Sequence, residues 1–232
     1  MYKNLDSYID TKKFLSFSRE ICLGISQSER GLCNPGSRTI GIEGYPNLKH
    51  PFESEPKFLE QDSKYVKSLT TTQYRDYFKY YYKVHYPVES IFLKTSNGYK
   101  NKHTSVGAKY TNNAKYFPSL MKWIEEETPF KEVGKIQFFI LNSFAKLTSH
   151  RDSMDFDYTN KPSDMLWFTI DKNAMSFWIK NENKKYYPDC TCAWFNENLE
   201  HGSDGVPDAT FCFRIDGTFK EDWDALHIIY GH

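Results

Sequence analysis

The sequence has few arginines, no long apolar run and no closely spaced pair of cysteines of the C-x-x-C type. Only 6 of its 30 basic residues are arginine, so an arginine within an apolar segment stands out. No signal peptide opens the chain, and no apolar run approaches membrane-spanning length. Its five cysteines are odd in number and do not indicate a disulfide framework. Cys190 and Cys192 would share one strand face as a metal pair, although ordinary small residues are the favoured interpretation. We therefore expect a reduced, cytoplasmic protein with no membrane-spanning segment.

The charge of the chain is balanced overall but divided along its length. Residues 1–110 contain 17 basic and 11 acidic residues, whereas residues 111–232 contain 13 and 19. A basic first half could meet an acidic partner, although such a split is also typical of two solvated faces. With only four arginines in the first half, the pattern does not favour a nucleic-acid-binding protein.

Composition and turn residues predict a β-rich fold in the second half of the chain. The 18 Phe, 17 Tyr and 5 Trp favour a β-rich core, and 232 residues can bury a sizeable one. A helix is expected to begin near Pro118, since proline suits the first helical turn. The expected strands are residues 135–141, 165–170, 174–180, 191–195, 210–215 and 225–230. Short strands with Gly, Asn, Asp and Pro between them favour a sandwich or a jelly roll in residues 111–232.

Residues 1–110 are expected to be an irregular and helical extension that packs on this jelly roll within one structural domain. Glycine and proline punctuate residues 1–56, which we interpret as irregular. Residues 57–84 have apolar side chains at three-four spacing and are expected to be helical, with their Tyr and Phe stripe against the barrel. Residues 95–113 are polar and are expected to be a loop that overhangs the open end of the barrel as a lid.

Two histidines and one carboxylate occur in the order of a metal site. His150 and Asp152 are two residues apart, so on a strand their side chains point to one face and can reach one ion. The 48 residues between Asp152 and His201 leave room for several strands, which would bring His201 from a neighbouring strand. Such a 2-His-1-carboxylate set binds non-haem Fe(II) and leaves three positions for a 2-oxo acid and dioxygen. The His-x-Asp pair alone also occurs by chance.

Arg214 lies in an otherwise apolar segment, thirteen positions after His201. Residues 210–215 are typical of a buried strand, where an unpaired guanidinium is costly. We therefore expect an anion to compensate Arg214, and its planar fork suits bidentate capture of a carboxylate. The alternative is a surface arginine on the polar face of the strand.

Four short runs extend this pattern: residues 117–124, 128–135, 193–196 and 214–217. Together with His150, Asp152 and His201 they resemble the aspartyl/asparaginyl β-hydroxylase branch of the Fe(II)/2-oxoglutarate oxygenases. The resemblance covers about the last half of the chain. It implies a double-stranded β-helix, a distorted jelly roll of the cupin-like type.

The resemblance also implies a set of cofactors and a reaction. His150, Asp152 and His201 would hold Fe(II), and Arg214 would bind one carboxylate of the co-substrate 2-oxoglutarate. Dioxygen would cleave 2-oxoglutarate to succinate and CO₂, and an unactivated C–H bond would be hydroxylated. The leading substrate class is an amino acid, a peptide or a protein side chain. Asp152 argues against a halogenase, because a halide would need its place on the iron.

Three further residues are candidates for contacts with the substrate. Residues 165–168 are apolar where the branch tends to carry a basic residue, and this segment contains Trp167. We interpret Trp167 either as a surface on which substrate stacks or as a buried core residue, with the second reading favoured. Asn173 and Asn196 are candidate polar contacts, and both also suit turns.

Two other functions remain open from the sequence. A nucleobase-oxidising dioxygenase would need an aromatic pocket and a basic channel, and the scarcity of arginine weighs against it. A binding module that keeps the jelly roll without chemistry would not need the triad and Arg214. The sequence does not indicate an oligomeric state.

Overall fold

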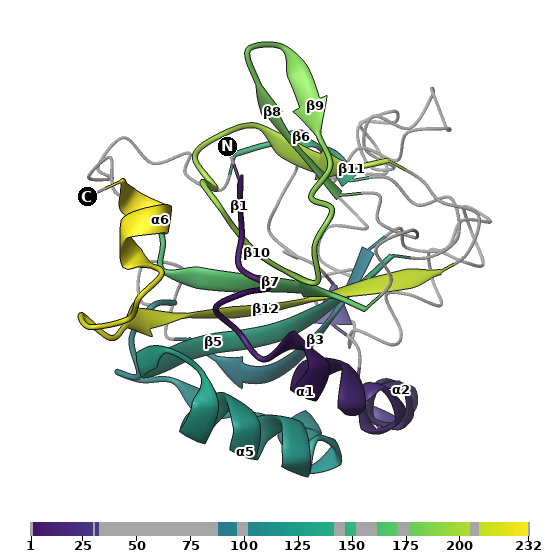
Figure 1. Cartoon of the computed structure of the whole chain (residues 1–232). Coiled ribbons are helices and arrows are strands. Elements are labelled where there is room, and N and C mark those ends of the chain that lie inside the picture. Colours follow the sequence, from purple (N-terminus) through teal and green to yellow (C-terminus); the bar gives the residue numbers. More distant parts are fainter. Residues whose placement is uncertain are drawn as a thin grey trace, which may run out of the picture.

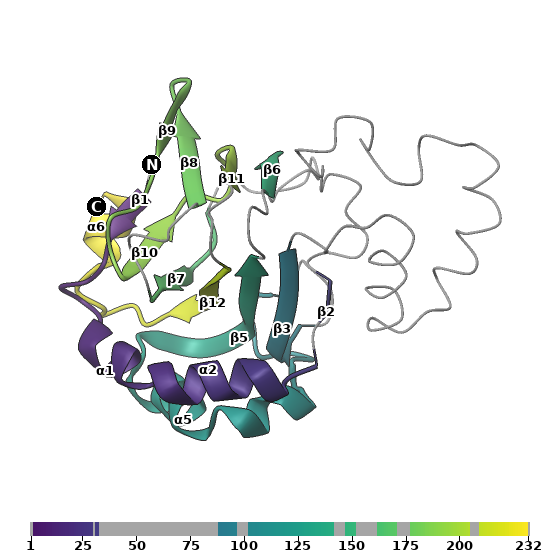
Figure 2. The same cartoon turned by 90° about the vertical axis from the view of Figure 1, so that its right-hand side faces the viewer.

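The chain folds into two antiparallel β-sheets, with helices on the outer face of the larger one (Figures 1 and 2). The computed structural model describes residues 2–29, 31–32, 88–96, 102–141, 147–151, 162–170, 177–204 and 209–231. In these stretches, no helix combines the length and the hydropathy that a membrane span requires.

The large sheet contains eight strands from both halves of the chain. They are β1 (Tyr2–Asn4), β2 (Gly31–Leu32), β3 (Val88–Thr95), β4 (Lys109–Tyr110), β5 (Phe130–Leu141), β7 (Met165–Thr169), β10 (Cys192–Phe195) and β12 (Thr210–Phe219). Their order is β1-β10-β7-β12-β5-β3-β2, and β4 pairs with β3 outside this path. The described parts of residues 1–110 therefore extend the sheet at both edges, through β1 on one side and β3 on the other.

The small sheet has four strands and faces the large one. They are β6 (Leu147–His150), β8 (Phe177–Asn181), β9 (Lys184–Tyr186) and β11 (His201–Ser203). Their order is β6-β11-β8-β9. Along the chain, β5, β7, β10 and β12 enter the large sheet, while β6, β8, β9 and β11 form the small one. This topology is the double-stranded β-helix, or jelly roll, that the sequence predicts.

Two helices near the N-terminus correct the expectation that residues 1–56 are irregular. Helix α1 (Thr11–Ser16) begins where the Asp10 carboxylate accepts a hydrogen bond from the backbone N–H of Lys13 at 2.9 Å. Helix α2 (Ser18–Gln27) follows directly. Both helices are short, so their apolar side chains give too few repeats to be recognised as helical in the sequence.

The predicted helix at Pro118 is confirmed, but the strand predicted at 225–230 is wrong. Helix α5 (Pro118–Glu127) follows a short 3₁₀ helix, η2 (Asn112–Tyr116). At the C-terminal end, helix α6 (Leu226–Tyr230) replaces the predicted strand. Ala225, the residue before the helix, and Ile229 within it are both buried and lie four positions apart, which is a helical spacing. The helices predicted at 57–84 lie outside the described residues.

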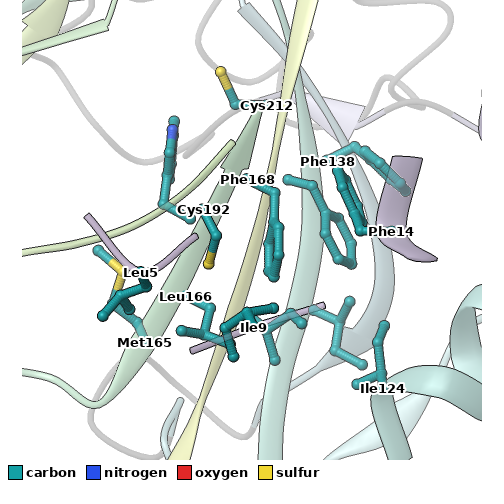
Figure 3. Close-up of a cluster of buried hydrophobic side chains, with 14 of the residues drawn as sticks. Leu5, Ile9, Phe14, Ile124, Phe138, Met165, Leu166, Phe168, Cys192 and Cys212 are labelled. Atoms are coloured by element: carbon teal, nitrogen blue, oxygen red, sulfur yellow. The ribbon is translucent and has the colours of Figure 1, made fainter. Parts of the chain in front are cut away.

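The main core lies between the large sheet and helices α1, α2 and α5 (Figures 2 and 3). Phe14 of α1 contacts Phe168 of β7, with ring centroids 4.5 Å apart, and Phe138 contacts Phe213 at the same distance. Trp123 of α5 meets the edge of Phe168. These rings are nearly inaccessible to solvent, so this face of the sheet is apolar along its length.

The segment predicted as a lid, residues 95–113, packs on the large sheet in its described parts: Thr95 ends strand β3, and residues 102–113 are bonded to the sheet. The carbonyl of Lys102 accepts a hydrogen bond from the N–H of Lys135 at 2.9 Å, and Thr218 donates one to the carbonyl of His103. A Cβ atom at Gly134 would lie 2.0 Å from the Lys102 carbonyl oxygen, so glycine is required for this approach. The lid prediction is therefore wrong for these residues, which are part of the packed structure.

Replacing Phe168 with alanine tests the importance of the layer between sheet and helices. We expect Phe168→Ala to lower the free energy of unfolding by about 3 to 5 kcal/mol, because it removes a fully buried ring from a packed cluster. The control is Leu23→Ala at a side chain that is 54% exposed, for which a change below about 0.5 kcal/mol is expected. Urea denaturation of both variants measures the difference, and similar losses would contradict this assignment of the core.

Candidate metal and anion site

The two histidines of the predicted triad are paired in the small sheet. Strands β6 and β11 are antiparallel, and His201 lies directly opposite His150 in their register. The Cα atoms of such partners are about 5 Å apart. The register shifts between His201 and Ser203, so the strands are regular at the histidines and irregular immediately beyond them.

His201 is buried and has a defined ring orientation. It is 3% exposed, and its Nδ1 lies 2.9 Å from the carbonyl oxygen of Leu199. Because a carbonyl oxygen only accepts, Nδ1 carries the hydrogen of this contact. The rings of Phe177 and Phe195 lie 5.9 and 5.3 Å from the imidazole. A backbone carbonyl that fixes the tautomer in this way is typical of histidines that bind metals.

The third residue of the triad, Asp152, lies outside the described residues, as does the side chain of His150. Within the stretches that the structure describes, no three His, Cys, Asp or Glu residues lie close enough together to hold a metal ion. Of the predicted metal site, the described residues show only the backbone pairing of His150 with His201 and the environment of His201.

Arg214 lies inside the jelly roll, on the face of β12 that is turned towards the small sheet. It is directly opposite Trp167 on β7 and Gln137 on β5. Its neighbours Phe213 and Ile215 point to the helix-covered face, as alternation along a strand requires. Arg214 is 4% exposed, so the alternative of a surface arginine does not apply.

Two protein carboxylates compensate the charge of Arg214. Its Nε donates to Oδ1 of Asp216 at 2.9 Å, and its NH2 lies 2.7 Å from the same oxygen. The NH2 group also donates to Oε2 of Glu197, which lies in the turn after β10. The sequence predicts an external anion at this position, whereas in the structure Asp216 and Glu197 provide the compensating charge.

A chain of hydrogen bonds connects Glu197 to residues from two other segments. Lys102 donates to Oε2 of Glu197 at 2.7 Å, and the hydroxyl of Ser163 donates to Oε1. Nε2 of His103 lies 2.8 Å from the Ser163 oxygen, which can accept because its own hydrogen goes to Glu197. Lys102 is 2% exposed and Glu197 is 5% exposed, so this network is buried and each bond polarises the next.

The pKa values of two members of the network are displaced from their usual range. Burial alone would raise the pKa of Asp216, but the attraction of Arg214, Lys135 and Lys102 outweighs this effect and holds the pKa at about 2. Burial lowers the pKa of His103 by more than its neighbouring carboxylates raise it. At neutral pH the site therefore contains an ionised Asp216 and a neutral His103.

Trp167 is buried, as the favoured interpretation of the sequence predicts. Its ring lies between the two sheets. It is 6% exposed and stacks on Phe177 at 4.7 Å, with Phe139 and Phe195 at 5.3 and 5.7 Å. Its Nε1 has no hydrogen-bond partner among the described residues. A buried N–H without a partner costs about 1 to 3 kcal/mol.

Of the two candidate asparagines, only Asn196 is described. Its side-chain oxygen accepts a hydrogen bond from the N–H of Asn198 at 2.9 Å, and its carbonyl accepts one from the N–H of Leu199. Asn196 therefore closes the turn between β10 and β11, the turn role that the sequence also allowed. Asn173 lies outside the described residues.

The sequence interpretation did not find Lys102, His103, Ser163 and Glu197. These residues come from three segments that are far apart in the sequence, and no spacing pattern connects them. The sequence did indicate Asp216, because residues two positions apart on a strand have side chains on the same face. Its position in the same run as Arg214 could have identified it.

Comparison with known proteins identifies structures of similar fold at very low sequence identity. A 2OG-Fe(II) oxygenase family oxidoreductase from Burkholderia pseudomallei has a TM-score of 0.38 and 7% identity, over 56% of this chain and 68% of that one. The viral collagen prolyl hydroxylase of Paramecium Bursaria Chlorella virus-1 has a TM-score of 0.32 and 9% identity, over 56% and 78%. A prolyl-4-hydroxylase from Pseudomonas putida has a TM-score of 0.33 and 7% identity, over 58% of this chain and 73% of that one. No family model and no curated protein matches the sequence. The aspartyl/asparaginyl β-hydroxylase branch stays a prediction.

The buried network predicts the response of stability to acid. We expect Asp216→Asn to lower the free energy of unfolding at pH 7 by about 3 to 5 kcal/mol, because it leaves buried cations without this carboxylate. The folded pKa of Asp216, about 2, lies below the unfolded value, so its stabilisation is complete above about pH 4 and is lost as the pH falls through 2. Between about pH 4 and pH 2, Asp216 should account for on the order of 2 kcal/mol of the decrease in the free energy of unfolding of the wild type. This part of the decrease should be absent in the variant.

Urea denaturation between pH 2 and 7 measures both effects. The control is Asp222→Asn, which removes an exposed carboxylate after β12 and should change stability by less than about 0.5 kcal/mol. The role assigned to Asp216 is wrong if the two variants lose the same stability at pH 7.

Proposed function

We propose that this protein is a non-haem Fe(II)- and 2-oxoglutarate-dependent dioxygenase that hydroxylates an unactivated C–H bond. The observation that carries the proposal is the direct pairing of His150 with His201 in the small sheet of a jelly roll. An amino acid, a peptide or a protein side chain is the proposed substrate class. Succinate and CO₂ are the products formed from 2-oxoglutarate.

The paired histidines fit one metal ion. Directly opposite residues of an antiparallel pair carry their side chains on the same face, so the register suits two ligands of one ion. In His201, Nδ1 donates to the carbonyl of Leu199, so Nε2 is the ring nitrogen that we propose as the metal ligand. Asp152, two residues after His150, is the proposed third ligand. Bound Fe(II) would supply the oxidative chemistry, for which these three ligands leave open positions.

Arg214 is the proposed partner of the distal carboxylate of 2-oxoglutarate. It lies on the interior face, and a series of ring contacts connects it with His201. Trp167 is directly opposite Arg214, its ring touches Phe195, and Phe195 touches His201. A dicarboxylate between the metal and Arg214 would thus be bordered by aromatic rings, which exclude water from the reacting atoms.

Trp167 is proposed as a further contact of the bound ligand. Its position opposite Arg214 places the indole next to the guanidinium in the sheet. The unsatisfied Nε1 would donate to an oxygen atom of the ligand and would thereby lose the energetic penalty of its burial. Arg214 would supply charge, and Trp167 would supply orientation.

Production of succinate from 2-oxoglutarate tests the enzyme class. We expect succinate with Fe(II), 2-oxoglutarate and dioxygen, and we expect His201→Ala to abolish both this activity and binding of Mn²⁺ as a substitute metal. The control is His227→Ala, which removes an exposed histidine on α6 and should leave both unchanged. No succinate from the metal-loaded wild type would favour the jelly-roll binding module. Comparison of amino acids, peptides and nucleosides as stimulants would then test the substrate class against nucleobase oxidation.

Arg214→Lys tests the position of the co-substrate. We expect the half-saturating concentration of 2-oxoglutarate to rise at least tenfold, because lysine keeps the charge but loses the planar fork. Mn²⁺ affinity should stay the same, since Arg214 is not a proposed ligand. An unchanged requirement for 2-oxoglutarate in this variant would remove Arg214 from the co-substrate site.

A further inference from the structure

We propose that Glu197 occupies part of the co-substrate site in the ligand-free protein, and that its displacement from Arg214 sets the affinity for 2-oxoglutarate. This inference rests on the proposed function, because it assumes that Arg214 binds the distal carboxylate. It assigns a role to a residue outside the predicted triad. Glu197 would act as an internal competitor of the co-substrate.

The geometry at Arg214 makes the competition specific. Asp216 takes the Nε side of the guanidinium, with contacts to Nε and NH2 at 2.9 and 2.7 Å. Glu197 approaches the same NH2 group from the terminal side. A ligand carboxylate that binds the terminal edge in a bidentate manner needs NH1 and NH2 together. It must therefore take the NH2 contact from Glu197, while Asp216 can stay in place.

The two carboxylates differ in their freedom to move. Asp216 is fully buried in the middle of β12, where it is paired with Met165 of β7 and lies 3.6 Å from the ammonium of Lys135. Glu197 belongs to the turn between β10 and β11 and is not part of a strand. A change in the Glu197 side chain therefore disturbs no strand pairing, whereas Asp216 is held within a strand that is paired on both sides.

Glu197 keeps two partners after it leaves Arg214. Lys102 donates to its Oε2 atom and Ser163 donates to its Oε1 atom. A buried carboxylate without a partner would be strongly unfavourable, and these two donors prevent that outcome. The exchange thus replaces one anion by another at Arg214, and the buried charges remain paired throughout.

Such an exchange lowers the apparent affinity in proportion to the fraction of protein that is ready to bind. If Arg214 is released from Glu197 in about one molecule in ten, the dissociation constant rises about tenfold above its intrinsic value. Removal of the competing charge should restore that factor. A residue that only orients Arg214 would have the opposite effect, because its loss would weaken binding.

Titration of 2-oxoglutarate into Mn²⁺-loaded protein without dioxygen tests the inference by calorimetry. We expect Glu197→Gln to bind 2-oxoglutarate about tenfold more tightly than the wild type, since the amide keeps the shape and loses the charge. Glutarate, which lacks the 2-oxo group, should show the same gain. The control is Glu200→Gln in the same turn, whose carboxylate pairs with Lys180 at 2.9 Å and is 36% exposed. Its affinity should equal that of the wild type.

Each result has a separate meaning. Equal or weaker binding by Glu197→Gln, with wild-type binding intact, would overturn the role of Glu197 and leave the proposed function standing. A wild type that binds Mn²⁺ but neither 2-oxoglutarate nor glutarate would overturn the proposed function. If Glu197→Gln does not fold, Glu197→Asp keeps the charge and shortens the reach to Arg214, so the same gain in affinity is expected from it. Unchanged or weaker binding by this second variant would overturn the inference.

Discussion

The alternation of side chains along β12 is the constraint on which both the core and the candidate site depend. Phe213 points to the helix-covered face, while Arg214 and Asp216 point between the sheets. Because the period of a strand is two residues, a slip of one position would move the guanidinium into the phenylalanine layer. Pairing of β12 with β5 on one side and β7 on the other excludes this slip. The apolar core therefore also fixes the direction of Arg214.

The buried ionic network has a structural as well as a chemical consequence. Lys102, Ser163 and Glu197 come from separate loops, and each reaches the interior through hydrogen bonds instead of strand pairing. Removing charges from water is costly, so the network is stable only while every member keeps its partners. Such a network is rigid, because the loss of one contact leaves the others uncompensated. Asp216, on the Nε side of the guanidinium, holds Arg214 in place, and the proposed exchange of Glu197 for a ligand keeps the charge of Arg214 compensated.

The sequence predicted the parts of the structure that are dictated by local pattern. Apolar runs identified β7, β10 and β12, and the single guanidinium in the last of them indicated that Arg214 needs a compensating anion. Helix α6 was mistaken for a strand because a short apolar run fits both periods until its neighbours are known. Glu197 could not be predicted as a partner of Arg214, since the pairing depends on the turn between β10 and β11. Long-range contacts of this kind leave no periodic trace in the sequence.

That same turn connects the two halves of the candidate site. Glu197 reaches Arg214 from its first residues, and two positions later the Leu199 carbonyl fixes the imidazole of His201. The hydrogen bond from Asn198 to Asn196 holds the turn between them. The orientation of a proposed metal ligand and the contact of the proposed carboxylate-binding arginine thus depend on one short segment. Because the Asn196 side chain and carbonyl hold the backbone of this turn through Asn198 and Leu199, both contacts depend on the same backbone conformation.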